Sequence, residues 1–284
     1  MFLQRMQLLF SDVSSLWSKY GGMYWTGVRN TLILAVVATA IGCLIGFICG
    51  ILQTIPHTKN DSPVKRVILA VIRAIVRVYV EVFRGTPMIL QAVTIFYGLP
   101  YFTGNAVQFT NKWTVAIIVV SINTGAYMAE SVRGGILSID PGQTEGAKAI
   151  GMTHLQTMTS VILPQALRNI MPQIGNNFII NVKDTSVMFI IGFFDFFAVH
   201  KSVSGAVFKY FPSAAIEMVG YLCMTLIASF LLRWLERKMD GAGSYELVQT
   251  DSLTATAGTY NYPAKGTPFD EKSREYGGMD GRGR

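Results

Sequence analysis

The sequence predicts an all-α protein that crosses a membrane several times. Of its 284 residues, 51% are hydrophobic and only 14% are charged, and the mean hydropathy is +0.39. Soluble domains carry about a quarter charged residues. Several apolar runs also reach the roughly 20 residues that a helical span requires. We therefore expect a polytopic helical membrane protein with about five spans.

Charge and cysteine content exclude other classes of protein. The net charge of +7 does not indicate nucleic-acid binding, because the basic residues are scattered and lie mostly at the ends of apolar runs, as they do in cytoplasmic loops. The three cysteines lie inside apolar segments, where they behave as small hydrophobes, and their spacing predicts neither a metal site nor a disulfide framework. The first long apolar run has spanning length, so no cleavable signal peptide is expected.

An N-terminal segment, 1–26, precedes the expected transmembrane domain, 27–239. The first span is predicted from about Thr31 to Leu52, a stretch free of charged residues. Small residues spaced four apart allow a second helix to approach closely, and this span carries them at Gly42, Gly46 and Gly50. A polar loop from Pro56 to Arg66 follows.

The stretch from Val67 to Pro100 has two characters. At about 100° per residue its charged residues fall within one sector of a helix; they are Arg66, Arg73, Arg77, Glu81 and Arg84. Glu81 is spaced for intrahelical pairing with the arginines on either side. This pattern favours a helix at the membrane interface or against a partner, with its charges toward water, over a direct ion-binding role. The second half, Thr86 to Leu99, is apolar and predicts the deeper part of a span.

The third span is predicted from about Trp113 to Met128, with a polar group of residues near its end. Ser131 to Asn169 is then the longest stretch that is not expected to cross the membrane. The fourth span should begin near Met171 and reach Phe197, and its first half is unusually polar.

A loop from His200 to Pro212 leads to a fifth span, Ala214 to Leu232. Residues 240–284 are polar and lack apolar periodicity, which predicts a disordered tail. Five spans put the termini on opposite sides of the membrane. The distribution of Lys and Arg over the loops favours the N-terminus outside and the C-terminus inside, although the N-terminal segment is also basic.

The long internal loop contains strong local helix signals. Asp140-Pro141 is typical of a helix start, Gly142 to Ile150 predict a short helix, and Gly151 supplies a left-handed stop. Thr153 can cap a second helix that runs until Pro164. The spacing fits a rigid cytoplasmic knob that transmits a partner's motion, and it fits an amphipathic loop resting on the membrane equally well.

Particular residues of this loop resemble a known signature. Glu145-Gly146-Ala147, then Gly151, then Ile162-Leu163-Pro164 is similar to the E-A-A … G … I-x-L-P motif of ABC importer permeases. Two departures stand out: Gly146 replaces the first alanine, and the spacer residue before Leu-Pro is missing. The first change lowers helix propensity by roughly 1 kcal/mol.

Further motifs resemble the polar amino acid uptake group of these permeases, and together they cover about Gly27 to Arg237. They are Arg84-Gly85-Thr86-Pro87 with Gln91, Tyr127-Met128-Ala129-Glu130 with Arg133-Gly134-Gly135, Gly142-Gln143, Leu163-Pro164-Gln165-Ala166 and Lys183-Asp184-Thr185-Ser186.

The resemblance implies a type I ABC importer transmembrane domain in a bacterial cell membrane. Its partners would be an ABC ATP-binding subunit, a second permease (identical or homologous), an extracytoplasmic substrate-binding protein and membrane lipids, with no nucleic acid. The chain would be no enzyme and would bind no cofactor or metal, since it contains no P-loop motif; ATP-Mg would be used by the partner. The cargo would be a polar amino acid of the glutamine, glutamate, arginine or histidine class, moved by alternating access.

Two sets of functional residues are expected, neither of them catalytic. The residues expected to couple the chain to the ATPase are Glu145, Gly146, Ala147, Lys148 and Gly151. Polar groups at membrane depth are costly and usually face a cavity or a partner, and the substrate pathway is expected at Arg84, Thr86, Gln91, Asn123, Tyr127, Glu130, Asn177, Asn181, Lys183 and Asp184.

The pathway residues also have a purely structural interpretation. Lys183 with Asp184, or Glu130 with Arg133, could pair and only hold the helices in place.

Three alternatives to this function remain. The chain could be an ion-coupled secondary transporter that uses Glu130 and Asp184, which needs no ATPase. It could be a scaffold that recruits a soluble enzyme through Ser131 to Asn169. It could also be a permease of the same class for another small solute, such as methionine or an opine.

Overall fold

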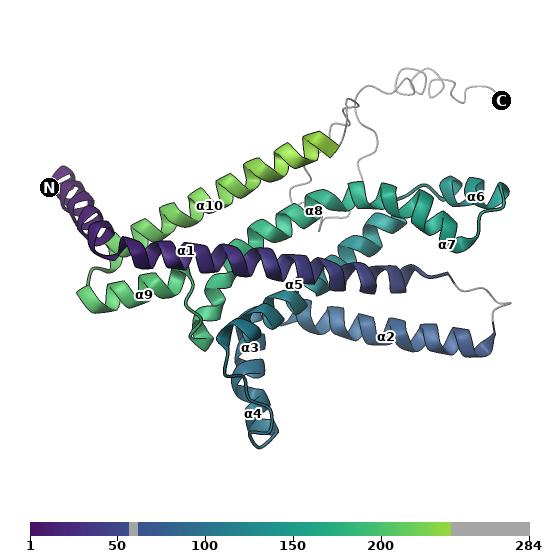
Figure 1. The fold of residues 1–284 in the computed structure, drawn as a ribbon, viewed down its shortest axis with the longest axis horizontal. Coiled ribbons are helices and arrows are strands. Elements are labelled where there is room, and N and C mark those ends of the chain that lie inside the picture. The colour runs from purple at the N-terminus through teal and green to yellow at the C-terminus, as the bar shows by residue number, and fades with distance from the viewer. Residues whose placement is uncertain (57–61, 240–284) are drawn as a thin grey trace, which may run out of the picture. The chain divides into compact units, whose positions relative to one another are not determined.

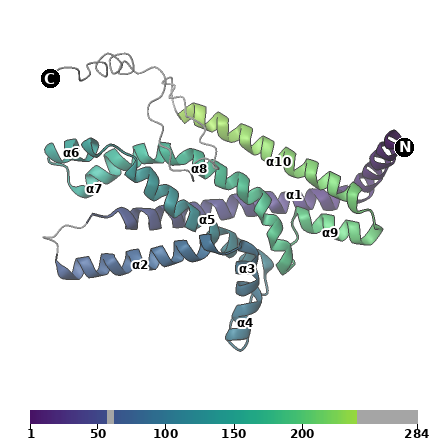
Figure 2. The ribbon, with the colours of Figure 1, turned by 180° about the vertical axis from the view of Figure 1, so that it is seen from behind.

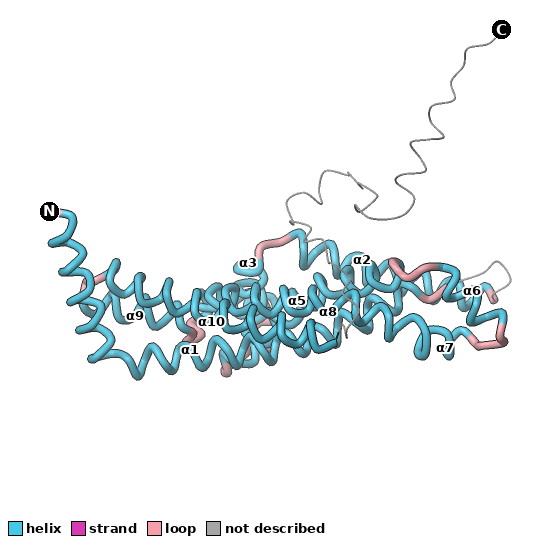
Figure 3. Tube along the Cα trace, turned by 90° about the horizontal axis from the view of Figure 1, so that it is seen from above, coloured by secondary structure: helices cyan, strands magenta, loops and turns pink. Residues whose placement is uncertain are grey.

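The computed structural model describes residues 1–56 and 62–239, and every regular element among them is helical. Figure 3 shows these helices joined by short loops. The all-α prediction is therefore confirmed for this part of the chain. The middle of the predicted loop from Pro56 to Arg66 and the predicted tail 240–284 lie outside the described residues.

The first helix is far longer than the predicted span. Helix α1 runs from Phe2 to Thr54 without interruption and contains the predicted span from Thr31 to Leu52, whose ends in the membrane stay a prediction. Its N-terminal half is helical because it has its own packing partners: Leu16 and Tyr24 are buried in a cluster with Phe196 and Val199. Figures 1 and 2 both show this half beside α9 and the beginning of α10.

Close approach of α1 to helix α5 (Lys112–Leu137) confirms the prediction from the glycine spacing. A Cβ added at Gly46 would lie 2.3 Å from Cβ of Met128. Gly42 and Gly50 face Thr124 and Val132 of α5 in the same way. Because no side chain fits at these positions, glycine allows the two backbones to pack directly.

Helix α2 (Pro63–Gly85) begins at Ser62, whose hydroxyl accepts a hydrogen bond from Lys65 N at 3.3 Å. The helix ends before Thr86-Pro87. The chain then forms the short helix α3 (Met88–Val93), a π-helical turn (Thr94–Gly98) and α4 (Leu99–Phe102), which point away from the long helices in Figures 1 and 2. The predicted change of character within Val67 to Pro100 is confirmed.

The internal loop leads into the fourth long helix without a stop. Helices α6 (Pro141–Ala149) and α7 (His154–Thr157), a π-helical turn (Met158–Ile162) and α8 (Leu163–Asp184) follow in order. The prediction that the second loop helix ends at Pro164 is wrong. The turn before Pro164 places this residue in the first turn of α8, where a missing N–H group costs no regular hydrogen bond. The predicted start of the fourth span, near Met171, lies inside α8.

After α8 the chain bends. A 3₁₀ helix (Thr185–Ile191) ends at Gly192, which has φ +73°, and α9 (Phe196–Val207) leaves at an angle of 53°. Asp195 caps α9 by accepting hydrogen bonds from Ala198 N at 2.9 Å and Phe197 N at 3.2 Å. The predicted fourth span to Phe197 is therefore bent before its end. The predicted loop from His200 is wrong as far as Val207, because this cap starts a new helix.

The last helix, α10 (Tyr210–Met239), contains the whole predicted fifth span. Among the described residues, α1, α5 and α10 are long and apolar enough to cross a membrane, and the bent pair of α8 and α9 can form a fourth span. The apolar stretch Met88–Phe102 is shorter, so five spans remain a prediction. Helix α5 continues to Leu137, beyond the predicted end at Met128.

Candidate functional site: a capped loop helix and two polar cavities

The start of helix α6 is as the sequence predicts. The Asp140 side chain accepts a hydrogen bond from Gly142 N at 2.7 Å, and Pro141 occupies the first helical position. Both features satisfy or remove N–H groups that have no partner within the helix. The helix is therefore defined from its first residue.

The end of α6 is fixed by a Schellman motif. Gly151 N donates to Lys148 O at 3.0 Å and Met152 N donates to Ala147 O at 3.1 Å, while Gly151 adopts φ +84°. Two residues later Thr153 and Gln156 form a reciprocal capping box that starts α7. Two well-defined caps with one residue between them leave little freedom in the turn from α6 to α7, as the predicted rigid knob requires.

The predicted coupling residues have different environments on this loop. Ala147 is only 6% exposed, because α6 packs against α7 and the π-helical turn that follows it. Glu145, Gly146 and Lys148 are exposed, whereas Gly151 sets the backbone direction. In Figure 1, α6 and α7 lie together at the end of the long helices away from the N-terminus. Contact with another protein would therefore involve the exposed residues Glu145, Gly146 and Lys148.

A polar network closes the break between α2 and α3. Gln91 is buried, and its Nε2 donates to Phe83 O at 2.9 Å and to Thr86 O at 3.0 Å. Asn123 of α5 donates to Phe83 O at 3.1 Å and to Gln91 Oε1 at 3.2 Å. A helix break at a proline frees carbonyl groups that need other donors at membrane depth. The predicted residues Thr86, Gln91 and Asn123 are thus brought together.

The predicted residues Arg84, Tyr127 and Glu130 also meet. Arg84 of α2 forms an ion pair with Glu130 of α5, and its guanidinium carbon lies 5.3 Å from the centre of the Tyr127 ring. The expected alternative, an ion pair between Glu130 and Arg133, is wrong. The Arg84 and Glu130 side chains are 38% and 47% exposed, so the pair stands at an accessible surface.

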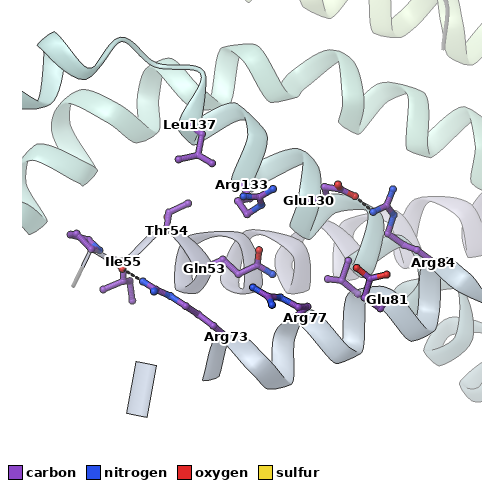
Figure 4. A pocket seen from close by; sticks show the side chains of 12 residues that line it. Gln53, Thr54, Ile55, Arg73, Arg77, Glu81, Arg84, Glu130, Arg133 and Leu137 are labelled. Atoms are coloured by element: carbon purple, nitrogen blue, oxygen red, sulfur yellow. Dashed lines mark hydrogen bonds and ion pairs between the residues drawn. The ribbon is translucent and has the colours of Figure 1, made fainter. Parts of the chain in front are cut away.

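Two polar cavities lie on either side of this ion pair, and both are lined by it. The first has a volume of about 530 Å³ and lies between the end of α1, α2 and α5 (Figure 4). Its charged lining residues are Arg73, Arg77, Glu81, Arg84, Glu130 and Arg133. The second, of about 500 Å³, reaches Asn169 and Gln173 of α8. The charged sector of α2 thus faces an open cavity between α1, α2 and α5 of its own chain, and its expected place at the membrane interface or against a partner stays a prediction.

The remaining predicted pathway residues lie on α8 and line neither cavity. Asn181 is buried and donates to Thr39 Oγ1 at 2.8 Å and to Thr124 Oγ1 at 2.9 Å, which links α8 to α1 and α5. Asn177 donates to Gln173 O at 2.9 Å. Lys183 is exposed and Asp184 is partly exposed at the end of α8.

Sequence reasoning missed a second buried polar group, where α1, α9 and α10 meet. His200 is 1% exposed, and its Nδ1 lies 2.9 Å from Ser213 Oγ and 3.8 Å from a Glu217 carboxylate oxygen. The Tyr24 hydroxyl also contacts Ser213 at 2.7 Å. An acidic residue inside an apolar span, as Glu217 is, was the available signal.

Comparisons with known proteins agree with this architecture. A family model described as binding-protein-dependent transport system inner membrane component matches residues 63–241. The glutamine transport system permease protein GlnP of Escherichia coli K12 is 35% identical over 213 residues, which cover 75% of this chain and 91% of that protein. The arginine transport system permease protein ArtQ of Bacillus subtilis is 32% identical, with 75% and 90% covered.

Solved structures give the same result. The crystal structure of an amino acid ABC transporter with histidines is 34% identical and superimposes with a TM-score of 0.68, covering 78% of this chain and 96% of that one. The inward-facing MetNI methionine ABC transporter, at 20% identity and a TM-score of 0.62, shares the fold. The chain therefore belongs to the family of binding-protein-dependent transport system inner membrane components, the permease subunits of ABC transporters.

Proposed function

We propose that the chain is the permease subunit of an ATP-driven importer for a polar amino acid of the glutamine, glutamate, arginine or histidine class. Relatives named for glutamine and arginine transport, at 35% and 32% identity, support this cargo class. The complex would contain two permease subunits and an extracytoplasmic binding protein. Residues 27–239 form the transmembrane domain, with the N-terminus outside the cell and the C-terminus inside.

In this proposal the ATP-binding subunit hydrolyses ATP-Mg and acts on the permease through α6. A push on α6 is transmitted because α6 packs on the π-helical turn before α8, and Gln165 of α8 donates to Gln143 of α6 at 3.3 Å. Helix α8 in turn packs against α1, α5 and α10. A movement of the loop therefore displaces a helix that contacts much of the transmembrane domain.

The observation that carries this proposal is that both helices of the internal loop, α6 and α7, are capped. Asp140 and the Schellman motif fix α6, and the Thr153 capping box fixes α7. These caps hold Glu145 exposed on α6, where the other exposed residues are polar or small. From α6 to α7 the exposed large apolar side chains are Ile150 and Leu155, which lie at the end of α6 and on α7. A loop that rests on lipid needs an apolar face, whereas a docking helix needs fixed polar groups.

The test is co-purification of the native chain and of Glu145→Lys from membranes in mild detergent. We expect the native chain to retain an ABC ATP-binding subunit and the variant to lose it, because the substitution reverses the charge at the contact. Gln108→Lys is the matched control, since Gln108 is exposed in the segment between α4 and α5. If Glu145→Lys retains the ATPase as well as the control does, docking through α6 is wrong.

The same material distinguishes the importer from an ion-coupled carrier. In reconstituted vesicles, uptake by an importer stops without ATP, and uptake by Glu145→Lys stops as well. Transport that continues without ATP, and survives Glu145→Lys, would favour the ion-coupled alternative.

A further inference from the structure

The first cavity has an unusual charge balance for a space beside a membrane span. Four arginines and two glutamates line it, which leaves two positive charges in excess. Its volume of about 530 Å³ lies within the range of small-molecule sites, roughly 300–1,000 Å³. A small anionic or zwitterionic group would fit both the volume and the charge.

Two of the four arginines are already engaged. Arg73 donates to the carbonyl oxygen of Ile55 at the end of α1, and Arg84 pairs with Glu130. In the described part of the chain, no ion pair or hydrogen bond involves the guanidinium of Arg77 or Arg133. These two side chains account for the excess of positive charge.

Arg77 and Arg133 come from different helices to the same space. Arg77 lies on α2 and Arg133 on α5, and Figure 4 shows Gln53 of α1 between them in this view. Glu81 lies one turn further along α2 and also lines the cavity. The cavity thus offers the guanidinium groups of Arg77 and Arg133 to a carboxylate of a ligand. It offers the Glu81 carboxylate and the Gln53 amide to an ammonium group of the same ligand.

The opposite face of α2 makes a lipid-facing role for these arginines unfavourable. Exposed apolar side chains cover that face; they are Val64, Val67, Ile68, Val71, Ile75, Val78 and Val82. With this face toward lipid or another permease, Arg77 faces the open cavity, where both Arg77 and Arg133 are exposed. Unpaired charges at membrane depth are costly, and such residues usually line water-filled pathways.

We propose that this cavity is an inward-side cargo site, in which Arg77 and Arg133 hold a carboxylate of the amino acid. A guanidinium binds a carboxylate through paired, charge-assisted hydrogen bonds. The excess positive charge selects glutamate and glutamine and rejects a cationic amino acid such as arginine. This inference rests on the proposed function and narrows its cargo to the acidic and neutral members of the class.

The test is equilibrium binding of radiolabelled L-glutamate, L-glutamine and L-arginine to the purified full chain. We expect glutamate and glutamine to bind at least about tenfold more tightly than arginine, since one charge-assisted hydrogen bond is worth about that factor. The double variant Arg77→Gln/Arg133→Gln should lose about tenfold or more in glutamate affinity and lose the preference over arginine.

Two further variants separate charge from fold. Arg77→Lys/Arg133→Lys keeps both charges, so it should retain the preference while glutamate binds more weakly. Arg66→Gln makes the same change as the glutamine variants on the same helix, at an exposed residue outside the cavity lining, and should bind like the native chain. Gel filtration and thermal denaturation compare the folding of all four proteins.

Several results would overturn the proposal. They are tighter binding of arginine, absence of binding for all three amino acids, and unchanged affinity in the double glutamine variant. An anionic lipid is the competing occupant of the cavity. The proposal would also be overturned if native mass spectrometry showed phosphatidylglycerol on the native chain but not on Arg77→Gln/Arg133→Gln, while that variant still bound glutamate. Native chain that binds glutamate without ATP-driven uptake in vesicles would contradict the proposed function and support the cavity assignment.

Discussion

Replacing Gly46 by alanine puts a methyl group into the closest contact between α1 and α5. The new Cβ would lie 2.3 Å from Cβ of Met128 and 2.8 Å from its carbonyl carbon. The backbone atom cannot move independently of α5, so the helices must separate. Gly22, on the same helix, has no atom within 4 Å of its would-be Cβ and provides a matched control.

The comparison of these two variants isolates the cost of separating the helices. Both gain the helix propensity of alanine over glycine, about 1 kcal/mol. Only Gly46→Ala has the cost of overpacking, typically about 1–3 kcal/mol. The difference between the variants should therefore equal the overpacking cost, and Gly46→Ala should be the less stable of the two.

Thermal unfolding in detergent, followed by a thiol-reactive dye, measures this difference. With the exposed Cys223 replaced by serine in both variants, the dye labels Cys43 and Cys49 as they become exposed. For a domain of this size about 1 kcal/mol corresponds to roughly 2–4 °C in Tm. We expect the Tm of Gly46→Ala to lie below that of Gly22→Ala by at least that interval. Equal shifts in the two variants would refute the idea that Gly46 is required for close approach.

Three further predictions concern single side chains. Asn181→Leu should lower the free energy of unfolding by about 1 kcal/mol, the typical contribution of a hydrogen bond between membrane helices. Asn176→Leu, at an exposed site, should leave it unchanged, and thermal unfolding curves of the two variants compare them. Gly151→Ala should reduce ATP-driven uptake because a left-handed residue costs about 1–2 kcal/mol without glycine. Gly205→Ala, at a helical glycine with no atom within 4 Å of its would-be Cβ, should preserve uptake. Arg84→Gln should reduce uptake of labelled glutamine, because it leaves a carboxylate between the two cavities without its partner; normal uptake would argue against a role for the pair.

Local signals were predictable from the sequence. Asp140-Pro141, Gly151 and Thr153 each act within a few residues, and the structure shows their caps as expected. The glycine spacing on α1 was equally informative, because one helical face depends only on the residues of that helix. Such features are encoded over short distances.

Helix boundaries were less predictable, because hydropathy marks only the ends of an apolar run, whereas the helix continues beyond those ends. Helix α1 extends back beyond Thr31, where Leu16 and Tyr24 pack against α9 and α10, and α5 continues to Leu137 beside the loop and α8. Pro164 was expected to end a helix, and a π-helical turn accommodates it instead. These outcomes depend on tertiary contacts.

The arrangement of the candidate site could not be predicted without the fold. Glu130 has Arg133 three residues away, yet its partner is Arg84 on another helix. The charges of α2 were recognised as one sector, but only the structure shows that this sector faces α1 and α5. Helical periodicity in the sequence predicts that the charges of α2 share one sector. Which helices that sector faces depends on how the helices pack in the fold.

The arginine sector of α2 has a consequence for biosynthesis. Each arginine near the middle of a helix opposes membrane insertion by about 2.5–3.5 kcal/mol, and α2 carries Arg73 and Arg77 in its central turns. This segment is therefore a poor insertion signal on its own, although its other face is apolar. Its integration at the translocon should depend on neighbouring segments that cover the charges, so α1, α2 and α5 are expected to enter the membrane as one cooperative unit.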